Sequence, residues 1–318
     1  MNQLKLKYQE FLEECIQKLK EQLGEGYNIQ LNTILKNNSI TMDGVVILKD
    51  GAKITPNIYL EEYFQLYEQG KDMEEIISEI TTVYFDKVRE RNDVDIQFTY
   101  ETMKSQIIYR VVNREKNKEL LKDCPHFEFL DLAVTFHCLV QDGMDSIATI
   151  RITNNHLKLW QVSMAEIYEC AKENTPKLMP PILRKLEEVL KEILSEENLP
   201  IDEEQVQVER KRLEADCEVP EYERADLYIL SNLKGINGAS CLLYPEIIKN
   251  FSKLLQCDLY ILPSSIHEII ILPAFDAYSK EHLEEMVTDI NQTQVPYEEV
   301  LSDHVYYYSS LENQIKLL

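Results

Sequence analysis

The residues that best combine reactive chemistry with close spacing lie in the segment Pro263-Ser-Ser-Ile-His-Glu268. A serine hydroxyl beside an imidazole can act as a nucleophile with its base, and a carboxylate can orient that imidazole. On an extended strand Ser265 and His267 would project to the same face, because strand side chains alternate with a period of two. The same groups can also contact a ligand, or bond the backbone of a turn.

The motifs that would decide between these roles are incomplete. The segment lacks the Gly-x-Ser-x-Gly elbow of serine hydrolases, and no second His follows His267 at the spacing of a zinc protease. The loop Gly235-Ile-Asn-Gly238 lacks the Lys and Ser/Thr of a phosphate loop, so a hairpin connection fits it better. A structural turn is the favoured interpretation, followed by ligand contact and then by nucleophilic catalysis. The candidate ligand-binding residues are Asn237, Ser264, Ser265, His267 and Glu268.

A second group of polar residues contains enough ligands for zinc, namely Cys124, His126, His137 and Cys138. Their spacing does not suit a metal site, because adjacent His137 and Cys138 would point to opposite faces of a strand. Cysteine buried as a small apolar residue explains this pattern better. We therefore expect no metal ion and no other cofactor.

The elements that must position these residues follow from hydrophobic periodicity and turn residues. Helices are expected at residues 4–23, 58–67, 73–89, 113–121, 163–173, 181–194, 245–255 and 279–290. A β-hairpin is expected at 28–48, and further strands at 107–112, 127–140, 147–152, 227–230, 239–243, 259–262, 269–272 and 305–308. Ser163, with Glu166 three residues later, predicts a capping box at the start of its helix.

This order of elements predicts an α+β fold, with two units of mainly antiparallel sheet and packed helices. The expected domains are an N-terminal unit at 1–194, an acidic linker at 195–222 and a C-terminal α/β sandwich at 223–318. In the C-terminal unit the order ββαββαβ predicts helices on one side of the sheet.

The acidic composition of the chain disfavours some classes of binding partner. The chain of 318 residues carries 33 basic and 56 acidic residues, a formal net charge of -23, and this charge repels nucleic acid and anionic membranes. Seven cysteines without a C-x-x-C pair indicate reduced thiols, and no apolar run is long enough for a membrane span. We expect a cytoplasmic protein with a protein or small-molecule partner.

Several segments together resemble an uncharacterised family of bacterial proteins that is known only as a domain of unknown function. The segments that carry the resemblance are Gly44–Ile47, Pro56–Glu61, Pro125-His126, Phe129–Leu132, Asn154–His156 with Trp160, Ala171–Asn174, Asn237–Ser240, Leu262–Glu268 and Leu301–Asp303. A more distant likeness, of order and spacing, is to the uncharacterised YtpQ-like proteins. The resemblance implies a bacterial cytosolic protein and no particular reaction.

Two functional hypotheses follow. The first is a nonenzymatic binding or protein-interaction protein, because no complete catalytic or cofactor motif occurs in the sequence. The alternative is a hydrolase of unrecognised type that uses Ser264, Ser265 and His267.

Overall fold

The computed structural model describes residues 2–51, 55–90, 98–142, 147–195, 227–274 and 279–318. Its contacts divide the chain into two compact units, residues 1–97 and residues 98–318. Helices and antiparallel sheets in both units confirm the α+β class. The three-part division at 194 and 223 remains a prediction, because residues 196–226, nearly all of the expected linker, lie outside the described residues.

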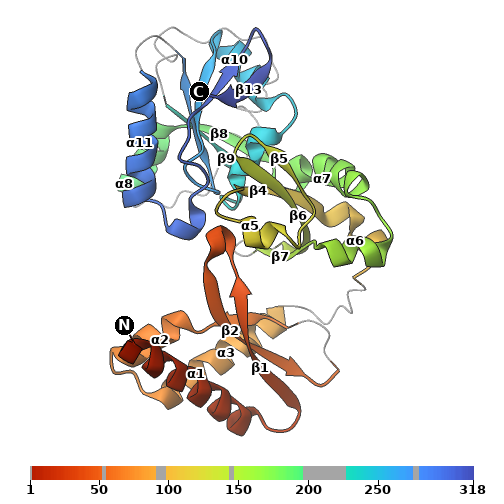
Figure 1. Cartoon of the computed structure of the whole chain (residues 1–318), viewed down its shortest axis with the longest axis vertical. Helices are drawn as coiled ribbons and strands as arrows, with labels where there is room; N and C mark the ends of the chain where they lie inside the picture. Colours follow the sequence, from red (N-terminus) through yellow and green to blue (C-terminus); the bar gives the residue numbers. More distant parts are fainter. Residues whose placement is uncertain (1, 52–54, 91–97, 143–146, 196–226, 275–278) are drawn as a thin grey trace. The chain divides into compact units, whose positions relative to one another are not determined.

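The first unit is a three-stranded antiparallel sheet with helices (Figure 1). Its elements are α1 (Asn2–Leu23), β1 (Tyr27–Leu35), η1 (Asn37–Ser39), β2 (Thr41–Lys49), β3 (Asn57–Tyr59), α2 (Glu61–Glu68) and α3 (Met73–Glu90). The hairpin of β1 and β2 and the helices at 4–23 and 73–89 confirm the sequence prediction. The helix expected to start at residue 58 starts after β3 instead, at Glu61.

A four-stranded sheet opens the second unit, together with α4 (Tyr100–Met103), η2 (Lys104–Gln106) and α5 (Lys118–Leu121). Its strands are β4 (Ile107–Asn113), β5 (His126–Phe129), β6 (Leu132–Asp142) and β7 (Ile147–Arg151). The long strand β6 pairs with β4 along one edge and with β5 and then β7 along the other. One face carries the polar residues Arg110, Thr135 and His137 among apolar ones, whereas Tyr109, Val134, Phe136 and Cys138 lie on the other face.

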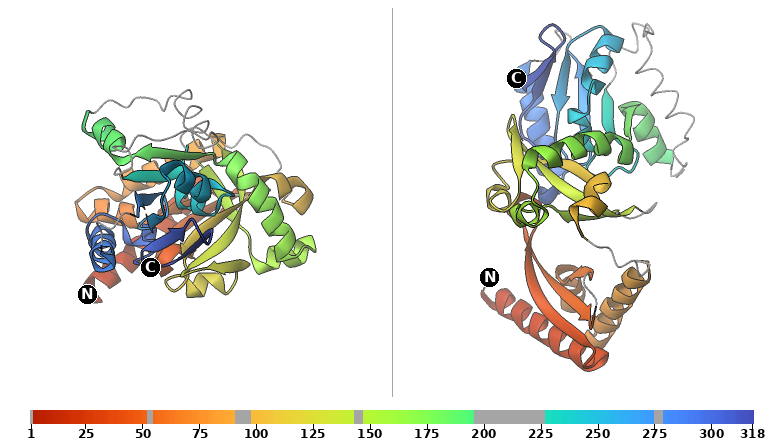
Figure 2. Two further views of the ribbon diagram at one scale, coloured as in Figure 1. Left: turned by 90° about the horizontal axis from the view of Figure 1, so that it is seen from above. Right: turned by 90° about the vertical axis from the view of Figure 1, so that its right-hand side faces the viewer.

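Helix α7 (Met164–Leu178) covers the apolar face of this sheet, as Figures 1 and 2 show, and α6 (Asn154–Trp160) precedes it. The ring of Tyr168 on α7 contacts Phe127, and Phe127 contacts Phe136 on β6. The predicted capping box is confirmed, because Ser163 and Glu166 each bond the other's backbone N–H. Thr175 also accepts a hydrogen bond from the backbone N–H of Tyr109, which fixes the helix to the edge of β4.

The remainder of the second unit is a six-stranded antiparallel sheet of order β13-β12-β10-β11-β9-β8 (Figure 1). The strands are β8 (Pro181–Lys185), β9 (Tyr228–Asn232), β10 (Leu259–Leu262), β11 (Ile269–Pro273), β12 (Tyr306–Ser309) and β13 (Gln314–Leu317). The helices are α8 (Leu186–Ser195), η4 (Gly238–Leu243), α10 (Ile247–Leu255), α11 (Lys280–Thr293) and η5 (Tyr297–Glu299).

Helices lie on both faces of this sheet, so the prediction of helices on one side was wrong. On one face, Leu283 and Val287 of α11 pack against Leu262 and Leu272. On the other, Phe251 of α10 contacts the ring of Tyr228, which is opposite Ile271 in the register. The apolar runs of β10 and β11 are therefore buried from two sides.

Three other predicted elements differ from the structure. The strand expected at 127–140 is a hairpin, because the chain turns at Leu130 in a left-handed conformation (φ 55°). The strand expected at 239–243 is the 3-10 helix η4, and the helix expected at 181–194 begins with β8, which pairs with β9. Each segment is apolar enough for either structure, so only its tertiary neighbours decide its conformation.

Candidate functional site

The predicted site lies in residues 263–268, between β10 and β11, and is called here the polar corner. Backbone hydrogen bonds tie it to two other segments of the second unit. The N–H of Ile266 donates to Glu299 O at 2.9 Å, and the N–H of Ala239 donates to Ile266 O at 3.1 Å. Ser265 forms an isolated antiparallel bridge with Val300. The polar corner is thus a crossing of three chain segments.

The imidazole of His267 faces groups of this crossing. Its Nδ1 lies 3.1 Å from Gly235 O and 3.3 Å from the backbone N of Asn237. These contacts need opposite roles of Nδ1, as donor to the carbonyl and as acceptor from the amide, so they belong to different tautomers. Nε2 lies 3.5 Å from Glu299 Oε1, and the His267 side chain is 25% exposed. Either tautomer holds the ring against the loop at 235–237.

Both serines of the polar corner accept hydrogen bonds from backbone N–H groups. Ser264 and Ser265 are 5% and 4% exposed. Ser265 Oγ accepts a hydrogen bond from the backbone N of His267 at 3.0 Å, and Ser264 O accepts one from Leu301 N at 2.9 Å. Within the described part of the chain, neither serine hydroxyl forms a hydrogen bond with the His267 ring. The nucleophile and base of the hydrolase alternative are therefore not paired in this arrangement.

Glu268 is half-buried beside two other titratable groups. Burial raises the pKa of its carboxyl; the charge of His267 opposes this rise, and the carboxylate of Glu299 adds to it. A carboxyl group with a raised pKa can mark a functional site, although buried structural groups show the same shift.

Asn237 and Gly238 fit the loop for steric reasons. Asn237 has left-handed backbone angles (φ 54°, ψ 31°), which asparagine tolerates better than most residues. A Cβ atom on Gly238 would lie 2.1 Å from Ser231 Oγ and 2.4 Å from His267 O. The Ser231 hydroxyl in turn donates to His267 O at 2.7 Å. Only glycine fits where the loop passes the polar corner.

Hydrogen bonds connect the predicted residues Asn237, Ser265 and His267 at one place, with Glu268 and Ser264 adjoining in the chain. Their role in ligand binding remains a prediction. The bonds found at this place stabilise the crossing of the chain segments.

A second polar region was not predicted as a site and lies on the face of the four-stranded sheet opposite α7. It is called here the basic face and consists of Arg110 on β4, Thr135 and His137 on β6, and Arg151 on β7. Arg110 is directly opposite Thr135, and Arg151 is directly opposite His137. Residues paired in this way share one face, with Cβ atoms about 5 Å apart. The three strands therefore place two guanidinium groups on either side of one imidazole.

Both arginines of the basic face have an unsatisfied Nε atom. In the described part of the chain the Nε atoms of Arg110 and Arg151 are buried and have no hydrogen-bond partner, although both residues are partly exposed. Among the described residues neither arginine forms an ion pair. Burial lowers the pKa of Arg110 to about 10, so the group stays charged at neutral pH.

His137 lies between the two arginines and is uncharged at neutral pH. Burial, followed by the charges of Arg110 and Arg151, lowers the pKa of this imidazole well below its usual range. Its Nε2 lies 3.2 Å from Thr135 Oγ1. Thr135 is only 1% exposed, and its hydroxyl can also donate to Arg110 O at 3.5 Å. The basic face therefore presents two cations and one neutral ring, with donors on three strands.

One signal in the sequence could have indicated the basic face. Arg110 interrupts the apolar run Ile107–Val112, and Thr135 and His137 interrupt Ala133–Val140 at a spacing of two. Charged residues inside apolar strands are rare unless they have a role. Sequence reasoning considered His137 only as a zinc ligand with Cys138, which the strand places on the other, buried face.

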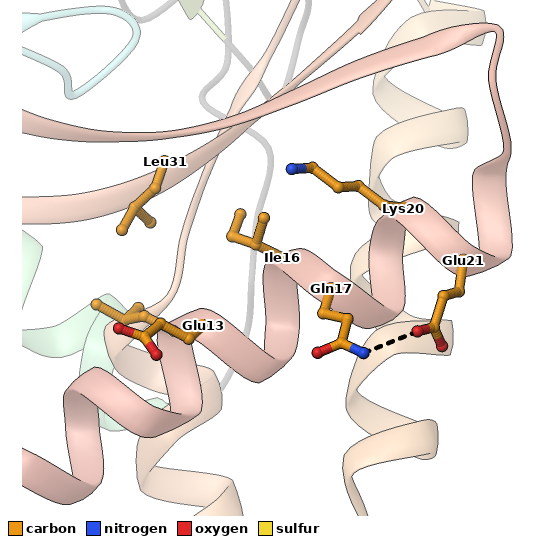
Figure 3. Close-up of a pocket in the computed structure, with 7 residues that line it drawn as sticks. Glu13, Ile16, Gln17, Lys20, Glu21 and Leu31 are labelled. Carbon is orange, nitrogen blue, oxygen red and sulfur yellow. Dashed lines mark hydrogen bonds between the residues drawn. The ribbon is translucent and has the colours of Figure 1, made fainter.

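Two pockets lie elsewhere. A mainly apolar groove of about 500 Å³ runs between α1 and β1 in the first unit (Figure 3), and a hydrogen bond joins Gln17 and Glu21 at its rim. A second pocket of about 460 Å³ lies in the second unit. It is lined by Glu128, Phe129, Leu130, Leu242, Tyr244, Glu246, Ile248, Lys249, Tyr308, Asn313, Gln314 and Ile315. Neither pocket includes residues of the polar corner or of the basic face.

In the described part of the chain, no three His, Cys, Asp or Glu side chains gather closely enough to hold a metal ion. His126, one of the residues weighed for zinc, instead places its Nδ1 2.8 Å from Cys124 O. No helix among the described residues has the length and apolar character needed to cross a membrane.

Comparison with known proteins gives one match. The model of a family of unknown function, DUF5688, matches residues 8–310. No curated protein and no solved structure matches the chain. The match confirms the expected resemblance to a domain of unknown function, whereas the likeness to YtpQ-like proteins and the bacterial origin remain predictions.

Proposed function

The chain belongs to the family of unknown function DUF5688, and we propose that it is a nonenzymatic binding protein whose ligand contacts Arg110, His137 and Arg151. The observation that supports this proposal most is that, among the described residues, the buried Nε atoms of both arginines on the basic face have no hydrogen-bond partner. Leaving a charged group partly desolvated and unpaired costs free energy. A bound ligand that supplies the missing acceptors would offset this cost.

The state of the nucleophilic groups favours binding over catalysis. Burial raises the pKa of the thiols of Cys15, Cys138 and Cys241 to about 12, so these cysteines stay protonated at neutral pH. The reactive form of cysteine is the thiolate. Ser265 Oγ accepts a hydrogen bond from a backbone N–H, and among the described residues neither serine hydroxyl of the polar corner is bonded to the His267 ring.

We also propose that the protein acts in the cytoplasm on a protein or small-molecule partner. The described cysteines are free thiols, as in a reducing compartment. The net charge of -23 opposes general association with nucleic acid or anionic lipid, so the basic face would act as a local site.

Native mass spectrometry of the protein purified from its own host tests this proposal. We expect a copurifying ligand or partner on the wild type and its loss from the double variant Arg110→Met/Arg151→Met. Arg89→Met is the matched control, because Arg89 is exposed on α3 of the first unit and pairs there with Asp86. Circular dichroism would confirm that the variants are folded.

Two results would contradict the proposal. One is turnover of a small substrate by the purified protein with no stably bound molecule. The other is a ligand that remains bound to the double variant at the wild-type level.

A further inference from the structure

We propose that the group recognised by the basic face is a phosphate, carried by a small molecule. This inference rests on the proposed binding function and adds the chemical class of the ligand. It follows from the number, direction and charge of the donors on three adjacent strands.

The donors of the basic face come from three strands. Arg110 and Arg151 lie on the two strands that flank β6, and adjacent strands are separated by about 4.8 Å. Arg110 is opposite Thr135 and Arg151 is opposite His137, so the two arginines are also offset by two residues along the sheet. Their Cα atoms are therefore about 12 Å apart, with His137 and Thr135 on the strand between them. Long arginine side chains can converge over that gap on one anionic group placed above His137.

A tetrahedral phosphate suits this arrangement better than a planar carboxylate. A phosphate group offers three oxygens to two guanidinium groups and to an imidazole donor at once. A carboxylate has two oxygens in one plane, so it accepts hydrogen bonds from fewer directions than a phosphate does.

The apolar residues around the basic face strengthen its attraction for an anion. Ile108 and Leu139 lie on the same face of the sheet and pack with Met179 in a buried apolar cluster. An apolar border lowers the local dielectric constant, which increases the interaction between the arginines and an anion. One carboxylate on this face, that of Glu128, is paired with Arg114.

The small size of the basic face disfavours a polymer. Nucleic-acid binding relies on many phosphate contacts along a basic surface, whereas this chain has a net charge of -23 and the site has only two arginines. A single phosphate group on a small molecule meets the same donors without the repulsion that a longer polyanion would meet.

The test measures thermal stability and calorimetric binding of the full chain with sodium phosphate and with O-phosphoserine. Sodium chloride at equal ionic strength and sodium succinate serve as comparison anions. For the wild type we expect a saturable rise in melting temperature with both phosphates, and at most a small rise with succinate. In Arg110→Met and in Arg151→Met the Kd for phosphate should increase at least tenfold.

Two further variants keep the result interpretable. Arg110→Lys retains the charge but loses the planar fork, so its affinity should lie between those of the wild type and Arg110→Met. Arg89→Met, in the first unit, should bind phosphate as the wild type does. If a variant at Arg110 unfolds, the variants at Arg151 still decide the outcome, because they remove donors from a different strand.

The phosphate inference fails if succinate or chloride stabilises the wild type as much as phosphate, or if the methionine variants keep the wild-type affinity. It also fails if a triglutamate peptide binds and phosphate does not. In these cases a ligand lost from the double variant in native mass spectra would still support the binding function. Phosphate binding that the wild type shows and both methionine variants lose would support the inference and the proposed binding function together.

Discussion

The polar corner and the basic face contain similar side chains but use them in opposite ways. At the polar corner, His267 Nδ1 and Ser265 Oγ lie within hydrogen-bond distance of backbone groups of the same unit. On the basic face, Arg110 and Arg151 have buried Nε atoms without partners. The first arrangement stabilises the fold, whereas the second leaves charge available to another molecule. A reactive-looking sequence motif is therefore weaker support for a site than unsatisfied polar groups on neighbouring strands.

The largest expected effect concerns the loop beside the polar corner. Gly238→Ala places a Cβ 2.1 Å from Ser231 Oγ and 2.4 Å from a backbone carbonyl, so the crossing must open. We expect the free energy of unfolding to fall by about 2–3 kcal/mol, measured by urea denaturation. Gly26→Ala is the control, since nothing lies within 4 Å of its added Cβ. Equal free energies of unfolding for the two variants would show that the crossing of chain segments has room for a Cβ atom at residue 238.

The variant His267→Ala tests whether the polar corner has a structural or a catalytic role. Loss of the imidazole leaves the carbonyl of Gly235 or the amide of Asn237 without its partner. The expected loss of stability is about 1–2 kcal/mol, measured by the same denaturation. An unchanged melting temperature together with loss of a measured hydrolytic activity would favour the hydrolase alternative instead.

The variant Arg110→Met should not lower the stability of the protein, in contrast to His267→Ala. Removal of a partly buried, unpaired cation relieves a desolvation cost, so stability should stay the same or rise by up to about 1 kcal/mol. Thermal denaturation in chloride buffer without phosphate measures this change, with the exposed Arg89→Met as the control. A loss of more than 1 kcal/mol would mean that Arg110 supports the fold, and the contrast with the polar corner would disappear.

The variant Glu268→Gln should show the smallest change in stability, and this change should depend on pH. The raised pKa means that the folded protein favours the protonated carboxyl, so stability is greatest below the usual carboxyl range and falls as pH rises through the raised value. His267 and Glu299 are the charged neighbours. At pH 7 the variant should melt slightly above the wild type, and the two should converge near pH 4. Glu285→Gln, exposed on α11, should show no such trend.

The sequence predicted those elements whose signals are local. The helices at 4–23 and 73–89, the first hairpin and the cap at Ser163 follow from periodicity and turn residues, and all are confirmed. The turn at Leu130 and the 3-10 helix η4 could not be predicted in this way. Their conformations depend on contacts from distant segments, such as the Asp131 carboxylate, which accepts a hydrogen bond from Ser302.

The same distinction applies to the candidate site. The polar corner was predicted because its residues are adjacent in sequence, and the structure brings Asn237 and His267 together as well. The basic face was missed because Arg110, His137 and Arg151 meet only through the register of three strands. That register is a property of the sheet, and no single strand contains it.

The strand β13 also has a consequence for the behaviour of the protein in solution. It forms one edge of the six-stranded sheet, where Lys316 is exposed and pairs with Glu312 at 3.2 Å. A charged side chain on an outer strand discourages a second molecule from adding its own strand there. Without residues 314–317, the uncharged strand Tyr306–Ser309 would become the rim, and self-association into aggregates would be favoured.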